Sequence, residues 1–257
     1  MPPSTDSLGR VQLDFVAREL TIKLVYYGPA LSGKTSNLQA MHRLSSDSAR
    51  GRLMTLDTRD DRTLFFDLLP LAFKTGDLSL RIKLFTVPGQ VIHSSTRRMV
   101  LQGADGVAFI GDSQLSESDA NRVAFLDLRQ NLKDNGIDLR KMPLVIQFNK
   151  RDLPAELIRS DAEIETLAKQ GREPVYKASA IKGEGVLETF LGLLTMTWAR
   201  LDSEHDFSNK FKIRSEDFTA GLVKQLGITG DPQRLIDAAV GVDPRSSTRS
   251  TSGGDRR

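Results

Sequence analysis

The eight residues GPALSGKT, at positions 28–35, constrain the fold of this chain more than any other segment. They follow the apolar run 20–27 and open the stretch 34–44, whose apolar spacing predicts a helix. The segment fits the pattern G-x-x-x-x-G-K-[ST], in which backbone N–H groups at a helix N-terminus surround an anion. A strand, this loop and a helix in succession therefore predict a phosphate-binding α/β protein.

Within this loop the ammonium of Lys34 is expected to reach β- and γ-phosphates, and the hydroxyl of Thr35 is expected to bind Mg²⁺. The loop alone does not choose between ATP and GTP. The phosphate-binding candidates in the loop are Gly28, Ala30, Leu31, Ser32, Gly33, Lys34 and Thr35.

Apolar, β-branched runs alternate with helical patterns along the first 200 residues. Short, continuously apolar strands between helices indicate a mostly parallel sheet with helices on both faces, and ligands of such sheets sit at the carboxyl ends of the strands. The predicted strands are 20–27, 52–56, 78–86, 107–111, 144–148 and 174–177, and the predicted helices are 34–44, 96–102, 117–134, 154–169 and 186–201.

Composition narrows the function classes. The chain has 257 residues, of which 39% are hydrophobic, and no cysteine, which excludes disulfides, thiolate metal sites and a catalytic thiol. A net charge of +3 spread along the chain gives no indication of nucleic-acid binding. No apolar run approaches the length of a membrane helix, and the N-terminal residues lack the pattern of a secretory signal, so we expect a cytoplasmic protein.

The segment FNKRD, residues 148–152, predicts which base is bound. Guanine presents two donors on one edge, and the carboxylate of Asp152 can accept both, whereas adenine has no such pair. Asn149 is expected on the N7 side of the purine, the stem of Lys150 over the ring, and the N–H of Ala180 on guanine O6. Alone, the segment also fits a solvated charged turn. The guanine-binding candidates are Asn149, Lys150, Asp152, Ser179 and Ala180.

The segment FTVPGQ, residues 85–90, ends the next predicted strand. The N–H of Gly89 is expected to contact the γ-phosphate, and Gln90 is expected to orient the attacking water. Ras-type chains have Asp where Thr86 stands, and a neutral hydroxyl is a weaker partner for a dication.

Residues 57–70 have a charged entry into an apolar run, which by itself describes a solvated loop before a strand. Between the phosphate loop and TVPGQ, this is where a first switch belongs. Thr63 is then a candidate Mg²⁺ ligand, and Arg62 is a candidate arginine finger with Arg59 as its rival. Either arginine also fits a surface ion pair. Two further acids, Asp105 and Asp112, are interpreted as capping and turn residues.

The last part of the chain changes character. Residues 202–242 have room for two short amphipathic helices, whereas residues 243–257 contain no aliphatic or aromatic side chain and are expected to be disordered. We expect residues 202–257 to be dispensable for nucleotide binding. Any membrane contact would be peripheral and weak, through the arginines of this tail.

With these residues assembled, the chain resembles the bacterial Ras-like small GTPases of the MglA (mutual gliding-motility protein) type. The resemblance rests on KLVYYGPALSGKT, DRTLFFDLLP, TVPGQV, GADGVAFIGDSQ and VIQFNKRDLP. It implies a P-loop G-domain over residues 12–201 that cycles between GDP and GTP with Mg²⁺. The intrinsic arginine of the family aligns with Arg62, its switch threonine with Thr63 and its catalytic glutamine with Gln90.

The resemblance also implies partners and a place in the cell. The GTP form is expected to be recognised by a roadblock-fold dimer, MglB, which stimulates hydrolysis, and the protein is expected to be recruited to a cell pole and to regulate polarity or motility. The downstream effector is not identified by the sequence.

Three functions compete: a hydrolysing switch, a nucleotide-bound scaffold that hydrolyses negligibly and presents its tail, and a nucleoside kinase. The FNKRD segment and Gln90 argue against a kinase. Gln90 and Arg62 favour the switch over the scaffold, whereas Thr86 and Ala30 favour the scaffold, because relatives usually have Gly in place of Ala30.

Overall fold

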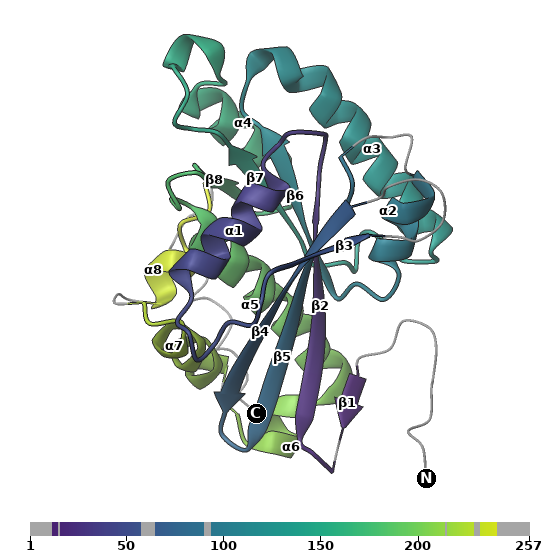
Figure 1. The fold of residues 1–257 in the computed structure, drawn as a ribbon, viewed down its shortest axis with the longest axis vertical. Coiled ribbons are helices and arrows are strands. Elements are labelled where there is room, and N and C mark those ends of the chain that lie inside the picture. Colours follow the sequence, from purple (N-terminus) through teal and green to yellow (C-terminus); the bar gives the residue numbers. More distant parts are fainter. Residues whose placement is uncertain are drawn as a thin grey trace, which may run out of the picture.

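The computed structural model describes residues 12–14, 16–57, 65–89, 94–213, 215–228 and 232–240. Eight strands among these residues form one sheet in the order β3-β4-β5-β2-β6-β7-β8, with β1 paired to β2 (Figure 1). The strands are β1 (Gln12–Asp14), β2 (Glu19–Tyr27), β3 (Met54–Asp57), β4 (Phe65–Thr75), β5 (Leu78–Thr86), β6 (Gly106–Asp112), β7 (Leu144–Asn149) and β8 (Val175–Lys177).

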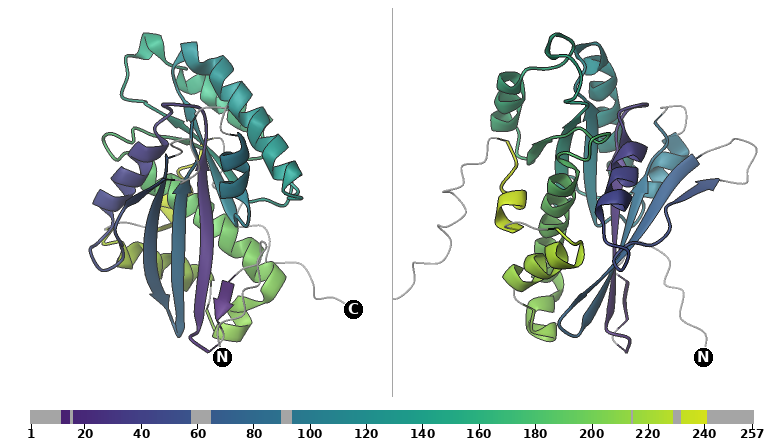
Figure 2. Two further views of the ribbon diagram at one scale, coloured as in Figure 1. Left: turned by 45° about the vertical axis from the view of Figure 1, so that its right-hand side comes forward. Right: turned by 60° about the vertical axis from the view of Figure 1, so that its left-hand side comes forward.

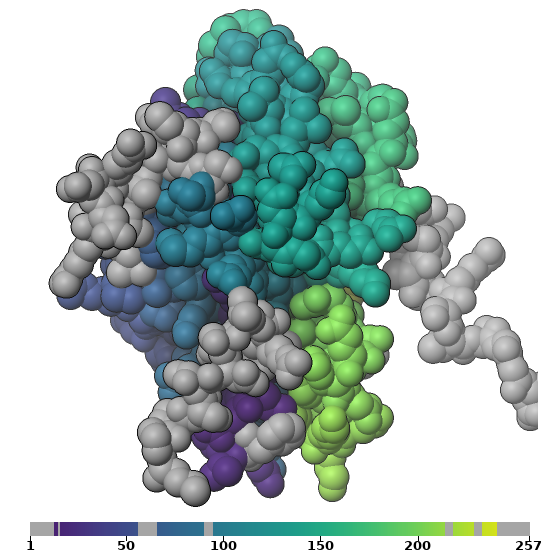
Figure 3. Space-filling view, turned by 90° about the vertical axis from the view of Figure 1, so that its right-hand side faces the viewer, coloured from purple at the N-terminus to yellow at the C-terminus, as the bar shows by residue number. Residues whose placement is uncertain are grey.

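Helices cover both faces of this sheet. Buried side chains of α1 and α5 form one hydrophobic core with β2, β4 and β5, whereas those of α2 and α3 form a second core with β2, β6 and β7. Figure 3 shows the second face, with the surface of α3 above the end of α5 and α6. The helices are α1 (Lys34–Leu44), α2 (Ser94–Leu101), α3 (Ser118–Asp134), α4 (Asp161–Gln170), α5 (Val186–His205), α6 (Phe207–Phe211), α7 (Ser215–Gln225) and α8 (Pro232–Ile236), with short 3-10 turns at Leu115–Glu117 and Ala155–Leu157.

The pairing of the strands brings the predicted loops to one edge. Strands β5, β2, β6, β7 and β8 are parallel neighbours, so their carboxyl ends lie at the same edge. Strand β6 is buried along its whole length, as expected of a parallel strand covered on both faces. The predicted α/β fold with a mostly parallel sheet is confirmed.

Strand β4 is the main difference from the sequence-based prediction, which left residues 65–75 unassigned. It pairs antiparallel with β5 along its length and with β3 at its beginning. A proline inside a run argues against a strand, and this run contains Pro70. The carbonyl of Pro70 accepts from the N–H of Gly51 on the side away from β5, so the missing N–H of Pro70 also falls on the outer side and interrupts no pairing with β5.

The helices agree with their predicted positions, with shifted ends. Helix α1 has the predicted bounds, and α4 begins at Asp161 rather than 154 because Ser160 and Glu163 form a capping box there. Helix α5 continues to His205, so the predicted domain boundary after residue 201 falls within a helix.

Residues after α5 pack against the face of the sheet that carries α1 and α5 (Figure 2). Phe218 of α7 is fully buried and stacks on Trp198 of α5, with ring centroids 4.2 Å apart. Val240 continues past α8 to form an antiparallel bridge with Val175 of β8. The two short amphipathic helices expected here correspond to α7 and α8, and this packing argues against the expectation that residues 202–257 are dispensable. Residues 243–257 lie outside the described part of the chain.

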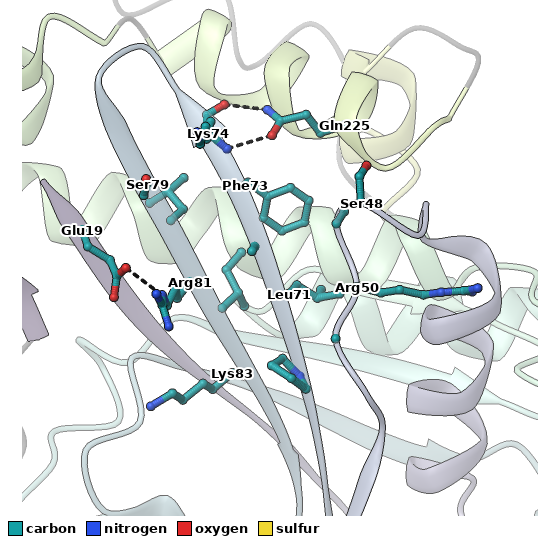
Figure 4. Close-up of a pocket in the computed structure, with 16 residues that line it drawn as sticks. Glu19, Ser48, Arg50, Leu71, Phe73, Lys74, Ser79, Arg81, Lys83 and Gln225 are labelled. Carbon is teal, nitrogen blue, oxygen red and sulfur yellow. Dashed lines mark hydrogen bonds and ion pairs between the residues drawn. The ribbon is translucent and has the colours of Figure 1, made fainter. Parts of the chain in front are cut away.

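The end of α7 also holds the outer edge of β4. The side-chain amide of Gln225 accepts from the backbone N–H of Lys74 at 2.7 Å and donates to the carbonyl of Lys74 at 2.5 Å (Figure 4). This pair of bonds replaces a neighbouring strand, which protects part of an otherwise unpaired edge. Beside it, a groove of about 520 Å³ runs along β4 and β5, at a distance from their ends near the phosphate loop.

Candidate functional site

The phosphate loop joins β2 to α1, as the sequence predicted. Its conformation is strained at Leu31, which has φ 60° although it carries a side chain, and Gly33 has φ 94° at the N-cap of α1. A Cβ at Gly33 would lie 2.1 Å from the side-chain nitrogen of Asn149, so only glycine fits here. The loop is therefore held in one shape by the neighbouring guanine-loop candidate.

A pocket of about 430 Å³ opens in front of this loop. Predicted phosphate-loop residues form one wall, and residues from the ends of β4 and β5 form the other. The lining includes Ala30, Lys34, Thr35, Asp67, Thr86 and Gly89. The structure thus brings Gly89 and Thr86 to the phosphate loop, as the order of the segments predicted.

Lys34 is a buried cation in the lining of this pocket. Its side chain lines the pocket but is only 6% exposed, and its ammonium donates to the carbonyls of Gly28 at 3.1 Å and Pro29 at 2.6 Å. The pKa of this ammonium is lowered to about 7, mainly by burial and secondly by the Arg97 guanidinium, while the Asp67 carboxylate raises it. A buried cation of this kind is stabilised by a phosphate in the pocket, because the phosphate offsets the cost of burial.

Three threonine hydroxyls converge on one carboxylate behind the pocket. The side chain of Asp67 accepts from Thr35 at 2.6 Å, from Thr55 at 2.9 Å and from Thr86 at 3.1 Å. Thr86 also accepts from the backbone N–H of Asp67 at 2.8 Å. The predicted Mg²⁺ ligand Thr35 is therefore hydrogen-bonded to a buried carboxylate on β4.

The backbone of Pro88 and Gly89 is fixed by a buried arginine. Arg97 of α2 donates to the carbonyl of Pro88 at 2.9 Å and to that of Gly89, and it forms an ion pair with Asp127 of α3 at 2.5 Å. Gly89 also lies directly against Ala30, because a Cβ on Gly89 would meet the Ala30 Cα at 2.4 Å. The phosphate loop and the TVPGQ segment are thus in van der Waals contact.

Asn149 joins the phosphate loop to the two guanine segments. Its side-chain nitrogen donates to the carbonyl of Ser32 at 2.8 Å, and its side-chain oxygen accepts from the N–H of Ala180 at 2.9 Å. The expectation that Asn149 and the Ala180 N–H face the purine stays a prediction beside these two bonds. Asn149 is therefore a structural tie between three loops.

The other guanine-binding candidates follow β7 and β8, at the same edge of the sheet as the phosphate loop. The carboxylate of Asp152 is exposed and accepts from the Ser179 hydroxyl at 2.6 Å. Lys150 has φ 67° and its ammonium pairs with Asp112 at 2.5 Å, with the Asp112 side chain 3% exposed. Asp112 accepts from the Gln114 N–H as well, so it is the predicted turn residue and also holds Lys150 in place.

No protein-family model matches this chain. It is 40% identical over 190 residues to the mutual gliding-motility protein MglA of Myxococcus xanthus (strain DK1622), covering 74% of this chain and 96% of that protein. The chain belongs to the MglA family of Ras-like small GTPases. It is also 29% identical over 119 residues to ADP-ribosylation factor-like protein 6 of Caenorhabditis elegans, covering 44% of this chain and 60% of that protein.

As a member of the MglA family, the chain is a GTPase that binds GTP and GDP, and the predicted family and enzyme class are confirmed. Among the described residues no helix has the length and apolar character needed to span a membrane. The same residues contain no cluster of three or more histidines and acids that would form a separate metal site.

Four residues of the predicted switch chemistry, Arg59, Arg62, Thr63 and Gln90, lie outside the described residues. Their roles stay predictions. Gly89, the described residue directly before Gln90, lines the phosphate pocket, and so does Asp67 of β4, the strand that follows the segment with Arg59, Arg62 and Thr63.

Sequence reasoning missed two residues that shape this MglA-family site. Asp67 is a lone carboxylate inside the apolar run LFFDLLP, and a charge at that place is a signal of a buried partner. Arg97 lies in an amphipathic helix with an adjacent arginine, and nothing local distinguishes the buried Arg97 from the exposed Arg98. Only the packing of α2 on α3 separates them.

Proposed function

We propose that this MglA-family GTPase is a molecular switch that hydrolyses GTP to GDP and controls cell polarity or motility through a nucleotide-dependent effector. The observation that carries the proposal is the similarity to a mutual gliding-motility protein over nearly that protein's whole length. The pocket between the phosphate loop and the ends of β4 and β5, with its buried Lys34, supports nucleotide binding.

In this proposal, separate groups of residues bind the phosphates, the guanine base and Mg²⁺. The loop from Gly28 to Thr35 and the N–H of Gly89 hold the phosphates, and Asp152 selects guanine by accepting from two donors. Asn149, Lys150, Ser179 and Ala180 complete the guanine end. Thr35 and Thr63 hold Mg²⁺, which neutralises charge on the β- and γ-phosphates when bound.

Hydrolysis in this proposal depends on two residues. Gln90 orients the attacking water, and Arg62 stabilises charge that develops on the γ-phosphoryl group. We further propose that a roadblock-fold dimer of the MglB type stimulates a slow intrinsic rate. The protein would act in the cytoplasm and be recruited to a cell pole.

A second function, the scaffold that hydrolyses negligibly, is favoured by one contact. Ala30 lies against Gly89, the residue that precedes Gln90 in the chain. In this proposal the methyl group of Ala30 would restrict the space for Gln90 and the attacking water. A displacement of about 1 Å at a reacting centre can lower the rate roughly 100-fold. Ala30→Gly should therefore raise hydrolysis and leave GDP affinity unchanged, whereas equal rates would mean that Ala30 only packs the loop.

Single-turnover hydrolysis of GTP, with and without a roadblock-fold dimer, tests the switch against the scaffold. In Ras and Gα proteins an arginine finger accounts for a rate factor of roughly 10³–10⁵. We expect Arg62→Ala and Gln90→Ala to reduce the stimulated rate by factors of this order, with GTP affinity preserved. Arg59→Ala is the matched control. A larger loss with Arg59→Ala would assign the finger to Arg59, and no hydrolysis in the wild type would favour the scaffold.

A further inference from the structure

Arg97 of α2 is a charged side chain with no exposed surface, which is rare unless the charge is paired. Its guanidinium donates to the carbonyl of Pro88 at 2.9 Å and to that of Gly89, and it forms an ion pair with Asp127 of α3 at 2.5 Å. The guanidinium carbon also lies 5.2 Å from the ring centroid of Tyr27, the residue before the phosphate loop. Four segments of the chain therefore meet at one buried cation.

The place of this cation follows from the packing of two helices. Helices α2 and α3 contribute to the same hydrophobic core and lie side by side (Figure 1). The hydroxyl of Tyr27 donates to Asp127 at 2.5 Å and accepts from Asn131 at 3.0 Å, so the carboxylate beside Arg97 is held by β2 as well as by its own helix. A planar guanidinium with fixed partners on both ends cannot turn without losing several of these bonds.

The two carbonyls that Arg97 holds belong to the wall of the phosphate pocket. Pro88 and Gly89 line the pocket, whereas Arg97 lies behind them, outside the lining. The Pro88–Gly89 peptide is trans, and in a planar trans peptide the carbonyl and the N–H point in opposite directions. Because the carbonyl of Pro88 points toward Arg97, the N–H of Gly89 points away from Arg97, toward the pocket side of this wall.

We propose that Arg97 is a positioning residue that fixes the Pro88–Gly89 peptide, so that the Gly89 N–H meets the γ-phosphate and raises the affinity for GTP relative to GDP. The inference rests on the proposed function, in which Gly89 contacts that phosphate. A donor that is already oriented loses little conformational freedom when the anion binds, and this lowers the cost of binding. GDP has no γ-phosphate, so its binding should not depend on this peptide.

Two other roles of Arg97 make different predictions. As a structural link between α2, α3 and the end of β5, it would change the stability of the fold and weaken both nucleotides equally. As a charge near the pocket it would favour the more negative GTP without any need for its hydrogen bonds, and its charge does contribute, after burial, to the lowered pKa of Lys34. The ratio of two nucleotide affinities, compared at constant net charge, separates positioning from both of these roles.

The experiment measures the affinities of the full-length protein for a fluorescent GDP and for a fluorescent GTP analogue that cannot be hydrolysed, both at saturating Mg²⁺. The double variant Arg97→Met with Asp127→Asn removes the cation and its counter-charge together, so that the net charge is unchanged and no buried charge is left unpaired. We expect its ratio of GTP-analogue affinity to GDP affinity to fall by about 10- to 100-fold, the usual worth of a hydrogen bond to a charged group. Its GDP affinity should stay close to that of wild type.

Arg97→Lys tests the same inference with the charge kept beside Asp127. An ammonium lacks the planar fork that holds two carbonyls and a carboxylate at once, so the affinity ratio should fall here too, by a smaller factor. Asp127→Asn alone is the matched control, because it breaks the ion pair and leaves Arg97 bonded to the two carbonyls. This control should lower stability without lowering the ratio. Arg98→Met, at the exposed neighbour, should change neither quantity.

Three results would overturn the inference. A wild-type ratio in the folded double variant would make Arg97 a structural link, and a wild-type ratio in Arg97→Lys would reduce its role to charge. A ratio that falls as far in Asp127→Asn as in the double variant would assign the effect to the ion pair. If the double variant does not fold, Arg97→Lys decides, since it leaves no charge unpaired. A wild-type protein that binds neither nucleotide would instead reject the proposed function, which is a separate outcome.

Discussion

The nucleotide edge of the sheet and the segment after α5 are held by opposite kinds of interaction. At the nucleotide edge, buried polar groups such as Lys34, Asp67 and Asn149 tie one loop to another through side-chain hydrogen bonds. After α5, the aromatic rings of Phe218 and Trp198 are stacked and buried. A single sheet thus carries a polar region arranged around a ligand and an apolar region arranged for stability.

This difference teaches where the effect of a substitution should appear. Groups at the nucleotide edge bear a cost in the free protein, because burial penalises their charge and Leu31 and Lys150 adopt left-handed backbone angles. Substitutions there should change ligand binding more than folding. Substitutions after α5 should change folding more than binding.

The largest expected effect is on guanine recognition. Asp152→Asn removes two charge-assisted hydrogen bonds to the base, which should weaken GTP and GDP binding by roughly 3–6 kcal/mol and shift preference toward xanthine nucleotides. Because Asp152 is exposed, the free energy of unfolding should hardly change. Titration calorimetry with GTP, GDP and the corresponding xanthosine tri- and diphosphates measures these affinities. The matched control is Asp161→Asn, a nearby exposed acid paired with Lys177, and unchanged GTP affinity in Asp152→Asn would remove Asp152 from the guanine site.

The second effect should fall on stability alone. Phe218→Ala leaves a cavity against Trp198 and should lower the free energy of unfolding by about 3–5 kcal/mol. GDP affinity of the folded fraction should stay at the wild-type value. Urea unfolding provides the measurement, with the half-exposed Leu126→Ala on α3 as the control. A loss of GDP affinity in Phe218→Ala without a loss of stability would contradict the expectation that substitutions after α5 change folding more than binding.

The third effect is a pH dependence of nucleotide binding. In the free protein the pKa of Lys34 is lowered to about 7, mainly by burial, and bound phosphates should raise it. Binding therefore favours the protonated ammonium, so GDP affinity should fall as pH rises from 7 to 8.5, by at most about tenfold per unit. Calorimetry at pH 8 in two buffers of different ionisation heat should detect uptake of close to one proton. An affinity that is flat over this range would contradict the assignment.

The smallest effect tests whether the two regions communicate. Gln225→Leu removes both hydrogen bonds to Lys74 and should lower the free energy of unfolding by about 1–2 kcal/mol. The neighbouring exposed Lys224→Ala is the control. Because β4 also carries Asp67, which lines the phosphate pocket, a tenfold change in the GDP affinity of Gln225→Leu would show that the segment after α5 acts on the nucleotide site through β4.

Local patterns account for most of what sequence reasoning found. The phosphate loop was identified because a strand, a glycine-rich turn and a helix follow one another directly along residues 19–44. The position of each guanine segment after a strand could be predicted for the same reason. Strand β4 was not predicted, since its charged entry reads as a loop. Pro70 is a further local signal against a strand, and only its place on the outer side of the β4–β5 pair makes it acceptable.

Contacts between distant segments could not be predicted. Asn149 bonds to Ser32 and Ala180, which are far from it in sequence, and no local pattern indicated these two bonds. The pattern of residues 202–242 left room for two short amphipathic helices, but any apolar surface would satisfy such a pattern. The burial of Phe218 of α7 against Trp198 depends on where α5 ends.

The sequence by itself determined the family, the fold class and the segments that form the nucleotide edge, because each of these depends on residues adjacent along the chain. Tertiary structure alone decided which charge stands beside the Thr35 hydroxyl. That charge belongs to Asp67 because antiparallel pairing of β4 with β5 places it next to Thr86, 19 residues away. Side chains on neighbouring strands meet through register, and register is a property of the folded sheet rather than of either segment.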